Sequence, residues 1–301
     1  MLVEDSAVDR QQIGAYLREW NLDFVVMDDG ADAWKAIQCP DAPSVVLLDW
    51  VLPGLDGIEL CKRIRALGAN GTYVYLVMLT SRDKKQDLLT AMAAGADDYI
   101  VKPVDPSELK ARILVAKRIV DLQQSLRFAA THDFLTKLLN RAEILASLKR
   151  EVSRSEREQK PFAIILADLD HFKKINDSMG HAAGDIVLRE IAERLKADLR
   201  PYDVIGRYGG EEFLIILPNC SLEVATRRAD EIRGLVCRNP IVTTFARVPV
   251  TVSMGVTASG SISNLTIEKL LQQADEALYL AKKSGRNRAQ GFAARETLLI
   301  S

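Results

Sequence analysis

The chain has 301 residues, a length that predicts about two domains. Hydrophobic residues make up 48% of it and charged residues 27%, which is typical of a globular protein. The formal net charge of -1, from 40 basic and 41 acidic side chains, argues against a general binder of nucleic acids or other polyanions. Four widely spaced cysteines, without a CxxC pair, favour free thiols over a zinc site or a disulfide framework. We therefore expect a soluble cytoplasmic protein with no secretory signal, no membrane span and no nucleic-acid partner.

The first 105 residues alternate short apolar runs with amphipathic helical patterns. The apolar runs predict five strands, at residues 1–3, 24–27, 45–48, 73–79 and 99–101. The amphipathic patterns predict helices between them, at residues 7–20, 30–38, 57–65 and 84–94. Strands separated by helices indicate an α/β fold, a doubly wound five-stranded parallel sheet with helices on both faces. Ligands of such sheets bind beyond the carboxyl ends of the strands.

Polar side chains stand where these predicted strands end, namely Glu4, Asp5, Asp49, Thr80 and Lys102. Each alone would more often be a helix cap or a surface charge, but the parallel topology would bring all of them into one crevice. Carboxylates packed together repel one another unless a divalent cation joins them, and oxygen ligands suit Mg²⁺. Mg²⁺ and Lys102 would together neutralise a phosphoryl group on Asp49, and the Thr80 hydroxyl would donate to its oxygens.

This region, residues 1–105, resembles the receiver domain of two-component response regulators. The resemblance lies in the strings VEDS at 3–6, LDWVLPGLDG at 48–57, LTS at 79–81 and the pair Lys102-Pro103, which the family joins by a cis bond. It implies that a sensor histidine kinase phosphorylates Asp49, and that Thr80, Tyr99 and Lys102 form the switch. The Mg²⁺ ligands that it implies, with Mn²⁺ as a substitute, are Glu4, Asp5, Asp49 and the backbone carbonyl of Val51.

Residues 106–130 predict one long helix, because they contain no glycine and no internal proline. The apolar residues at positions 115, 119, 122, 126 and 129 follow spacings of 4, 3, 4 and 3, the seam of a coiled coil. We favour a coiled-coil linker that dimerises two chains, so that the protein is a homodimer. The alternative is a helix docked on a neighbouring element of its own chain.

Residues 131–301 follow a second pattern. Helices are predicted at residues 141–158, 183–199, 222–233 and 267–284. Strands are predicted at residues 162–168 and 248–256, with a further pair around the Gly-Gly turn within 204–217. Strands separated partly by helices and partly by a tight hairpin indicate an α+β domain with a mixed central sheet.

Two acidic segments stand out in this second region. Gly209 and Gly210 are followed directly by Glu211 and Glu212. Glycines let a ligand approach the backbone closely, although an exposed acidic turn is the commoner reason for two adjacent glutamates. A second acidic strand end, Asp168, makes a nucleotide site the better interpretation. Clustered carboxylates with lysines nearby are typical of metal-assisted phosphoryl chemistry.

Polar residues after this strand end suit a guanine nucleotide. Asp185 could accept both hydrogen bonds from the N1–H and N2–H₂ edge of guanine, a donor pair that adenine lacks. Asn176 would complete the readout. Lys282 and Arg286 stand at the end of the last predicted helix, where terminal phosphates could bind.

Residues 133–288 resemble the GGDEF family, the diguanylate cyclases, through the signature Gly-Gly-Glu-Glu-Phe at 209–213. The resemblance implies that Asp168, the Leu169 carbonyl and Glu211 bind Mg²⁺ or Mn²⁺. It implies that Glu211 or Glu212 helps to deprotonate the ribose 3′-hydroxyl and that Lys173 stabilises charge on the phosphates. The GTP-binding residues that it implies are Asn176, His181, Asp185, Gly209, Gly210, Lys282 and Arg286. Lys137 departs from the family, which carries glycine in this turn, and we interpret Asp170 as structural.

Arg200 and Asp203 stand three positions apart, as the partners of a surface salt bridge often do. In the GGDEF family this spacing marks an inhibitory site, so the resemblance implies that the product, cyclic di-GMP, binds here. An arginine can fork onto a phosphate or the Hoogsteen edge of guanine, and an aspartate can accept from guanine. Candidates to complete the site are Arg227, Arg228 and Arg233.

These features predict a phosphorylation-regulated diguanylate cyclase that converts two GTP into cyclic di-GMP and two pyrophosphates across a dimer, with product inhibition. The predicted domains are a receiver domain (1–105), a helical coiled-coil linker (106–130) and a GGDEF domain (131–301). The alternative is a catalytically silent GGDEF module that senses GTP or cyclic di-GMP. Such modules typically lose a metal ligand or a signature acid, whereas Asp168, Lys173 and Glu211 are all present. A transcription factor lacks support, because the chain shows no helix-turn-helix pattern and no basic stripe.

Overall fold

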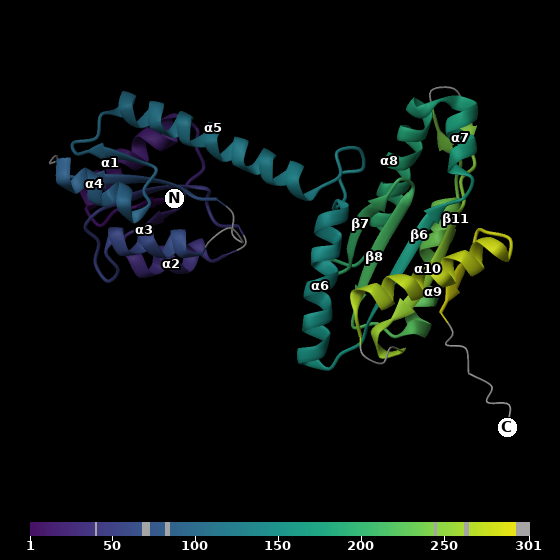
Figure 1. Cartoon of the computed structure of the whole chain (residues 1–301). Helices are drawn as coiled ribbons and strands as arrows, with labels where there is room; N and C mark the ends of the chain where they lie inside the picture. Colours follow the sequence, from purple (N-terminus) through teal and green to yellow (C-terminus); the bar gives the residue numbers. More distant parts are fainter. Residues whose placement is uncertain (40, 68–72, 82–84, 244–245, 262–264, 293–301) are drawn as a thin grey trace. The chain divides into compact units, whose positions relative to one another are not determined.

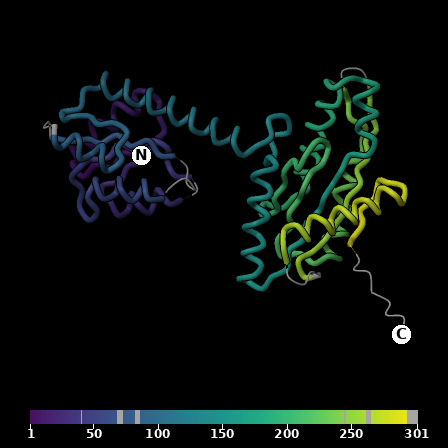
Figure 2. The backbone as a smooth tube through the Cα atoms, viewed as in Figure 1, coloured from purple at the N-terminus to yellow at the C-terminus, as the bar shows by residue number. Residues whose placement is uncertain are grey.

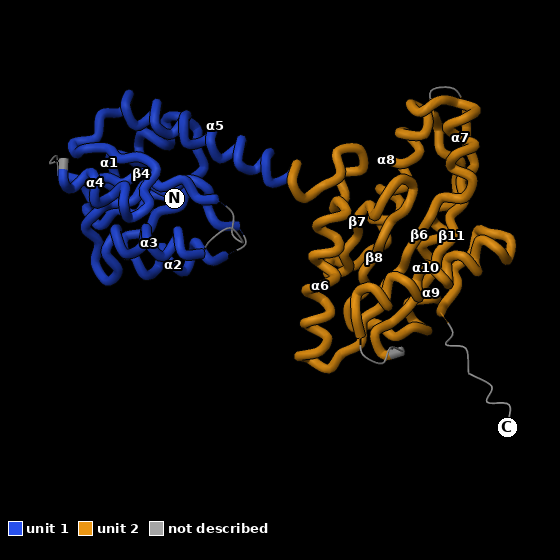
Figure 3. Tube along the Cα trace, in the orientation of Figure 1, with its two compact units in different colours: residues 1–128 blue, residues 129–301 orange. Residues whose placement is uncertain are grey.

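The computed structural model divides the chain into two units, Met1–Phe128 and Ala129–Ser301 (Figures 1 and 3). The structure describes residues 1–39, 41–67, 73–81, 85–243, 246–261 and 265–292. Figure 2 follows the backbone through both units, from purple at the N-terminus to yellow near the C-terminus. Within the described ranges, no helix combines the length and the apolar character that crossing a bilayer requires.

The first unit is built on a sheet of five parallel strands in the order β2-β1-β3-β4-β5. Their bounds are Leu2–Val3 (β1), Val26–Met27 (β2), Val45–Asp49 (β3), Tyr75–Thr80 (β4) and Asp98–Val101 (β5). The central strands β3 and β4 are almost entirely buried, as expected of a parallel sheet that is covered on both faces. The predicted doubly wound five-stranded sheet is therefore confirmed.

Helices cover both faces of this first sheet. Their bounds are Ala7–Glu19 (α1), Gly30–Ile37 (α2), Gly57–Ala66 (α3), Lys85–Ala94 (α4) and Pro106–Thr131 (α5). Helices α2, α3 and α4 contribute to one core layer, and α1 and α5 to the other (Figure 1). Ser6, Asp29 and Asp56 accept hydrogen bonds from the first-turn N–H groups of α1, α2 and α3, as N-cap residues do. The predicted start of α4, at residue 84, lies outside the described residues.

Helix α5 carries two apolar faces. Leu109, Ala116 and Val120 are buried in the core of the first unit. By contrast, Leu122 and Leu126 of the predicted seam are 59% and 57% exposed. The C-terminal part of the seam therefore does not pack on the core to which the N-terminal part of the helix belongs.

The second unit is built on a sheet in the order β12-β11-β6-β8-β7. Its strands are Phe162–Leu169 (β6), Val204–Gly209 (β7), Glu212–Pro218 (β8), Val252–Ala258 (β11) and Ala289–Gly291 (β12). Strands β11 and β12 are parallel, whereas the other neighbours are antiparallel, which confirms the predicted mixed sheet. A separate antiparallel pair joins Ile241–Val242 (β9) to Arg247–Val248 (β10).

Helices also cover both faces of this second sheet. Their bounds are Arg141–Glu158 (α6), Phe172–Met179 (α7), His181–Ala197 (α8), Leu222–Cys237 (α9) and Ile267–Lys283 (α10). Helices α8 and α9 share one core layer, and α6 and α10 share the other (Figure 1). Glycine at position 255 lets α10 approach β11 closely, because a Cβ atom there would lie 2.0 Å from the Ala274 carbonyl oxygen. The close approach of α10 to β11 fixes the position of α10 and of Lys282 near its end.

Several elements of the second unit differ from the prediction. Helix α7 was not predicted, because it has only eight residues and is followed by Gly180, whose φ of 78° interrupts the helical pattern. Helix α8 consequently begins at residue 181 rather than 183. The predicted strand 248–256 is divided between β10 and β11, and β9 and β12 were missed. Strands of two or three residues are too short to show a hydrophobic period.

Candidate functional site

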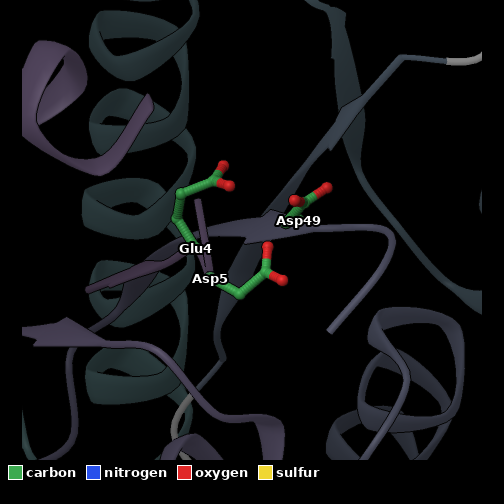
Figure 4. Close-up of side chains that lie close together, drawn as sticks. All are labelled: Glu4, Asp5 and Asp49. Atoms are coloured by element: carbon green, nitrogen blue, oxygen red, sulfur yellow. The ribbon is translucent and has the colours of Figure 1, made fainter. Parts of the chain in front are cut away.

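An acidic cluster lies at the carboxyl edge of the first sheet. Glu4, Asp5 and Asp49 each place a carboxylate oxygen within 4.8 Å of the others, and Figure 4 shows the three side chains gathered beside the end of β3. Glu4 and Asp49 are buried, whereas Asp5 is exposed, so the cluster reaches solvent at Asp5. Several oxygen donors at this separation fit a hard cation such as Mg²⁺.

Lys102 forms ion pairs with carboxylates of this cluster. Its Nζ atom lies 2.8 Å from a Glu4 oxygen, 2.9 Å from Asp49 and 3.0 Å from Asp9. Burial opposes the charge on this ammonium, but hydrogen bonds to Glu4, Asp49 and Asp9 outweigh it and raise the pKa of Lys102. Burial raises the pKa of Glu4 to about 7, although its hydrogen bond to Lys102 opposes the shift. Asp9 was missed by the sequence interpretation; it lies in the first turn of α1, whereas Lys102 follows β5.

The remaining residues predicted for the first site lie on neighbouring elements. Thr80 ends β4 and is 3% exposed, and its carbonyl accepts a hydrogen bond from the Lys102 N–H at 2.8 Å. Tyr99 lies on the adjacent strand β5 and packs in part against the core below α2, α3 and α4. The peptide bond between Lys102 and Pro103 is cis. Val51 follows Asp49 by two residues and is 59% exposed.

The acidic site of the second unit is set by strand register. The Gly-Gly turn joins β7 to β8, and Gly210 has a φ of 43°, which glycine adopts with little strain. Strand β8 pairs with β6 so that Glu212 stands opposite Asp168. Directly paired residues of an antiparallel sheet point to the same face, so these two carboxylates lie side by side. Leu169 follows Asp168, and its N–H donates to the Glu211 carbonyl at 3.4 Å.

The charges around this pair favour a cation. Burial raises the pKa of Asp168, and Glu211 and Asp170 add to the shift. Burial also raises the pKa of Glu212, and the charge of Asp168 adds to the shift. Lys282 of α10 opposes both shifts and lies 2.9 Å from Asp168, from Nζ to Oδ2. Oxygen donors with a surplus of negative charge fit a hard divalent cation.

Four residues predicted to bind GTP or to act on it lie on α7 and α8. Lys173 and Asn176 lie on α7, and His181 and Asp185 lie near the start of α8, across the turn at Gly180. Asn176 and Asp185 are half-buried, whereas Lys173 and His181 are exposed. The amide oxygen of Asn176 faces the backbone of α8 beside Asp185. The two predicted base-reading residues therefore lie where α7 meets α8.

Asp170 ties the predicted phosphate-binding loop to the end of β6. Its Oδ2 atom accepts from the Asn287 N–H at 3.0 Å and from the Thr251 hydroxyl at 2.7 Å, and its Oδ1 atom accepts from the Ser253 hydroxyl at 2.7 Å. Arg286, the residue before Asn287, is exposed and has a φ of 60°. The interpretation of Asp170 as structural did not foresee this link, because its partners lie more than 80 positions away in the sequence.

Arg200 and Asp203 close a turn between α8 and β7. The Arg200 N–H donates to the Asp203 carboxylate at 2.9 Å, and the Asp203 N–H donates to the Arg200 carbonyl at 3.0 Å. The Arg200 guanidinium is exposed and donates to the Tyr202 hydroxyl at 3.1 Å. A backbone turn, rather than a salt bridge, thus holds the pair. Three arginines were suggested to complete an inhibitory site. Arg228 forms ion pairs with Asp198 and Glu231. Arg233 contacts Asp230 and Asn287, whereas Arg227 is exposed.

A contact that the sequence did not reveal supports the Gly-Gly turn. Arg207 donates to both carboxylate oxygens of Asp133, at 3.1 and 3.2 Å, and to the Gly210 carbonyl at 2.9 Å. The turn after α5 is therefore bonded directly to the acidic hairpin. Lys137, in the same turn, has a φ of 58°, a left-handed conformation that glycine would adopt with less strain.

Comparison with known families assigns both units. Residues 1–114 match the model of the response regulator receiver domain. Residues 130–288 match the model described as the GGDEF domain of diguanylate cyclases.

Individual relatives agree with these matches. Response regulator PleD of Caulobacter vibrioides is 35% identical over 98% of this chain, which spans 66% of the length of PleD. Diguanylate cyclase DgcP of Pseudomonas aeruginosa is 40% identical over 54% of this chain, which corresponds to 24% of DgcP. The coiled coil and GGDEF domain of DgcB from Caulobacter crescentus, solved with c-di-GMP, is similar with a TM-score of 0.56 and 29% identity, over 62% of this chain and 97% of that one. Diguanylate cyclase SiaD of Pseudomonas aeruginosa, solved with its activator SiaC, is similar with a TM-score of 0.53 and 37% identity, over 61% of this chain and 71% of that one.

Proposed function

Because the chain belongs to the GGDEF family of diguanylate cyclases and carries a response-regulator receiver domain, we propose that it joins two GTP molecules into cyclic di-GMP. The observation that carries this proposal is the pairing of Asp168 with Glu212 across β6 and β8, beside the Gly-Gly turn. A silent sensing module would be expected to lack one of the acids, whereas Asp168, Glu211 and Glu212 are all present.

For the second unit we assign a divalent cation to Asp168, the Leu169 carbonyl and Glu211. The raised pKa of Asp168, caused first by burial and then by neighbouring acids, supports this assignment because a cation would relieve that repulsion. Bound Mg²⁺ or Mn²⁺ would supply charge neutralisation on the phosphates of GTP.

The chemical step is attack by the 3′-hydroxyl of one GTP on the α-phosphorus of the other. A new P–O bond forms, the bond to the bridging oxygen of the β-phosphate breaks, and pyrophosphate leaves. Glu211 or Glu212 accepts the hydroxyl proton, a role that the raised pKa of Glu212 suits. A second identical step in the opposite direction closes the ring and releases a second pyrophosphate.

The other polar residues of the second unit hold the nucleotide. Asn176, Asp185 and His181 bind the guanosine part, while Lys173 stabilises charge on the reacting phosphate. Lys282 and Arg286 bind the terminal phosphates. Lys282 gives up its ion pair with Asp168 when it binds them. Gly209 and Gly210 let the nucleotide approach the backbone.

Each GGDEF module holds one GTP, so two chains have to meet before the reaction can occur. The exposed side chains of Leu122 and Leu126 on α5 offer an apolar seam for a second copy of this helix. We therefore propose a homodimer joined by a coiled coil of α5.

We further propose that a sensor histidine kinase phosphorylates Asp49, with Mg²⁺ held by Glu4, Asp5, Asp49 and the Val51 carbonyl. Lys102 contacts Asp49, so a phosphoryl group there would change the contacts of Lys102, with Thr80 and Tyr99 as the switch. Helix α5 begins four residues after Lys102, which gives a short route from the switch to the dimer seam.

The exposed guanidinium of Arg200, beside Asp203, would bind cyclic di-GMP as an inhibitor.

The test is an assay of cyclic di-GMP formation from GTP and Mg²⁺, with and without beryllium fluoride as a phosphoryl mimic, alongside light scattering for mass. We expect faster synthesis and a larger dimer fraction with the mimic, and slower synthesis when cyclic di-GMP is added. A chain that makes no product in either state, yet binds GTP, would be a sensor instead of an enzyme. Equal rates in both states would contradict the switch and leave the cyclase intact.

A further inference from the structure

We infer that Gly184, the fourth residue of α8, is a positioning residue for guanine recognition, because it leaves the space that holds the Asn176 amide beside Asp185. This inference rests on the proposed function to the extent that it takes GTP as the ligand.

The first observation is the position of this glycine. It is buried inside a helix of 17 residues, where alanine would favour the helix more strongly than glycine does. A Cβ atom at position 184 would lie 2.0 Å from the Asn176 amide oxygen and 3.1 Å from its Cγ atom. No side chain tolerates the shorter distance, so the absence of a Cβ atom is what admits the amide.

A second helical glycine, Gly234, lacks the crowding found at Gly184. Gly234 also lies inside a helix, α9, and a Cβ atom there would meet no described atom within 4 Å. The two positions share residue type and helical setting but differ in what a methyl group would contact. Gly234 therefore serves as a matched control.

The crowding would act on the amide more than on the fold. The atom nearest to the added Cβ is the far end of the Asn176 side chain, which can rotate away from α8. The next neighbour, Cζ of Phe172, lies at 3.1 Å and would have to yield by only a small shift. Alanine at position 184 would thus displace Asn176 while leaving α7 and α8 packed together.

The position of the Asn176 amide matters because its hydrogen bonds to a base depend on the orientation of the amide plane. The planar Asn176 amide places its oxygen against the backbone at Gly184, the residue directly before Asp185. Asp185 would accept from the N1–H and N2–H₂ groups of guanine, and the amide would donate to an acceptor of the same base. Two groups fixed relative to each other discriminate against adenine, because adenine would leave them unpaired.

The experiment measures binding without turnover. The full chain, in the presence of Mg²⁺, is titrated by calorimetry with α,β-methylene GTP and, separately, α,β-methylene ATP. The proteins compared are wild type, Gly184→Ala, Asn176→Ala, the double variant carrying both changes, and Gly234→Ala.

We expect Gly184→Ala and Asn176→Ala each to weaken binding of the guanine analogue by about tenfold or more, and to change binding of the adenine analogue by less than about twofold. The double variant should bind like Asn176→Ala alone, since the crowded atom is gone. Gly234→Ala should bind like wild type, and the melting temperatures of both glycine variants should stay within about 4 °C of wild type. In turnover, Gly184→Ala should raise KM for GTP and leave kcat largely intact.

Wild-type affinity of Gly184→Ala for the guanine analogue, or additive losses in the double variant, would overturn the inference. If Gly184→Ala unfolds, rescue of folding by Asn176→Ala supports the crowding, and failure of that rescue overturns it. A chain that makes no cyclic di-GMP but shows the expected binding pattern would contradict the proposed activity and support this inference.

Discussion

The two units gather their carboxylates by different geometries. In the first unit, Glu4 and Asp5 follow β1 and Asp49 ends β3, so neighbouring parallel strands deliver their carboxyl ends to one edge. In the second unit, Asp168 and Glu212 stand opposite each other on antiparallel strands. A parallel sheet gathers residues by where strands end, whereas an antiparallel sheet gathers them by register.

The lysine at each site reflects this difference. Lys102 contacts three carboxylates and its side chain is 15% exposed, so it is held within the acidic cluster. Lys282 contacts Asp168 and is 34% exposed, at the end of a helix. An ammonium enclosed by acids would suit the phosphoryl group proposed for Asp49. An ammonium at a helix end would suit the larger, charged nucleotide proposed for the second site.

The largest effect should come from removing a carboxylate of the second site. Glu211→Gln keeps the size of the side chain but removes its charge, and we expect cyclic di-GMP synthesis to fall by about 10³-fold or more. Chromatography of the product from GTP and Mg²⁺ measures the rate, and circular dichroism verifies the fold. Asp49→Asn is the matched change in the first site, and it should retain basal synthesis while abolishing activation by a phosphodonor. Comparable losses of basal synthesis in both variants would contradict the division of labour between the two sites.

A second change tests whether helix α5 forms the dimer interface on which synthesis depends. Placing glutamate at both Leu122 and Leu126 puts charges into the proposed seam, so we expect light scattering to report monomers and synthesis at low protein concentration to fall by about 10- to 100-fold. Leu114→Glu is the control, because Leu114 is 62% exposed and lies outside the seam. A dimeric, active double variant would show that α5 is not the interface.

A third change tests the role of Lys282 at the end of α10, the counterpart of Lys102 in the first unit. We expect Lys282→Gln to raise KM for GTP by about tenfold, because a charged hydrogen bond to the phosphates is lost. Lys283→Gln is the control, since Lys283 is adjacent in the sequence and exposed. Steady-state kinetics distinguish the two variants. Equal changes in KM would show that Lys282 contributes only to the overall positive charge and makes no specific contact with the phosphates.

The smallest effect concerns the stability of the first unit. The pKa of Glu4 is raised from 4.5 to about 7, chiefly by burial, so in this interval the folded state holds a proton that the unfolded chain releases. Stability therefore falls as pH rises from 4.5 through 7, by about 1–3 kcal/mol from this group. Glu4→Gln should remove that decline.

Urea denaturation at pH 5 and pH 8, with EDTA present, checks this expectation. Tryptophan fluorescence reports the first unit selectively, because Trp20, Trp34 and Trp50 are the three tryptophans of the chain. Glu19→Gln removes an exposed acid of α1 and serves as the control. A pH dependence that persists unchanged in Glu4→Gln would show that another group causes it.

Much of this protein was already determined by its sequence. Apolar runs separated by helical patterns predicted the parallel sheet, and acids at strand ends predicted that Glu4, Asp5, Asp49 and Lys102 would meet. This succeeded because the topology of a parallel sheet carries every strand end to the same edge. The hairpin was predicted from its Gly-Gly turn, and the mixed sheet from the combination of this hairpin with strands separated by helices.

The tertiary structure alone decided which distant side chains support these sites. Asp9 beside Lys102, the three partners of Asp170 and the Asn176 amide against Gly184 are contacts between separate elements. Hydrophobic periodicity identifies the buried face of one helix or strand, but it does not say which element packs there or how closely. Helix α7 illustrates the limit, because eight residues show too little of a period to be recognised, yet they carry the amide that we expect to read guanine.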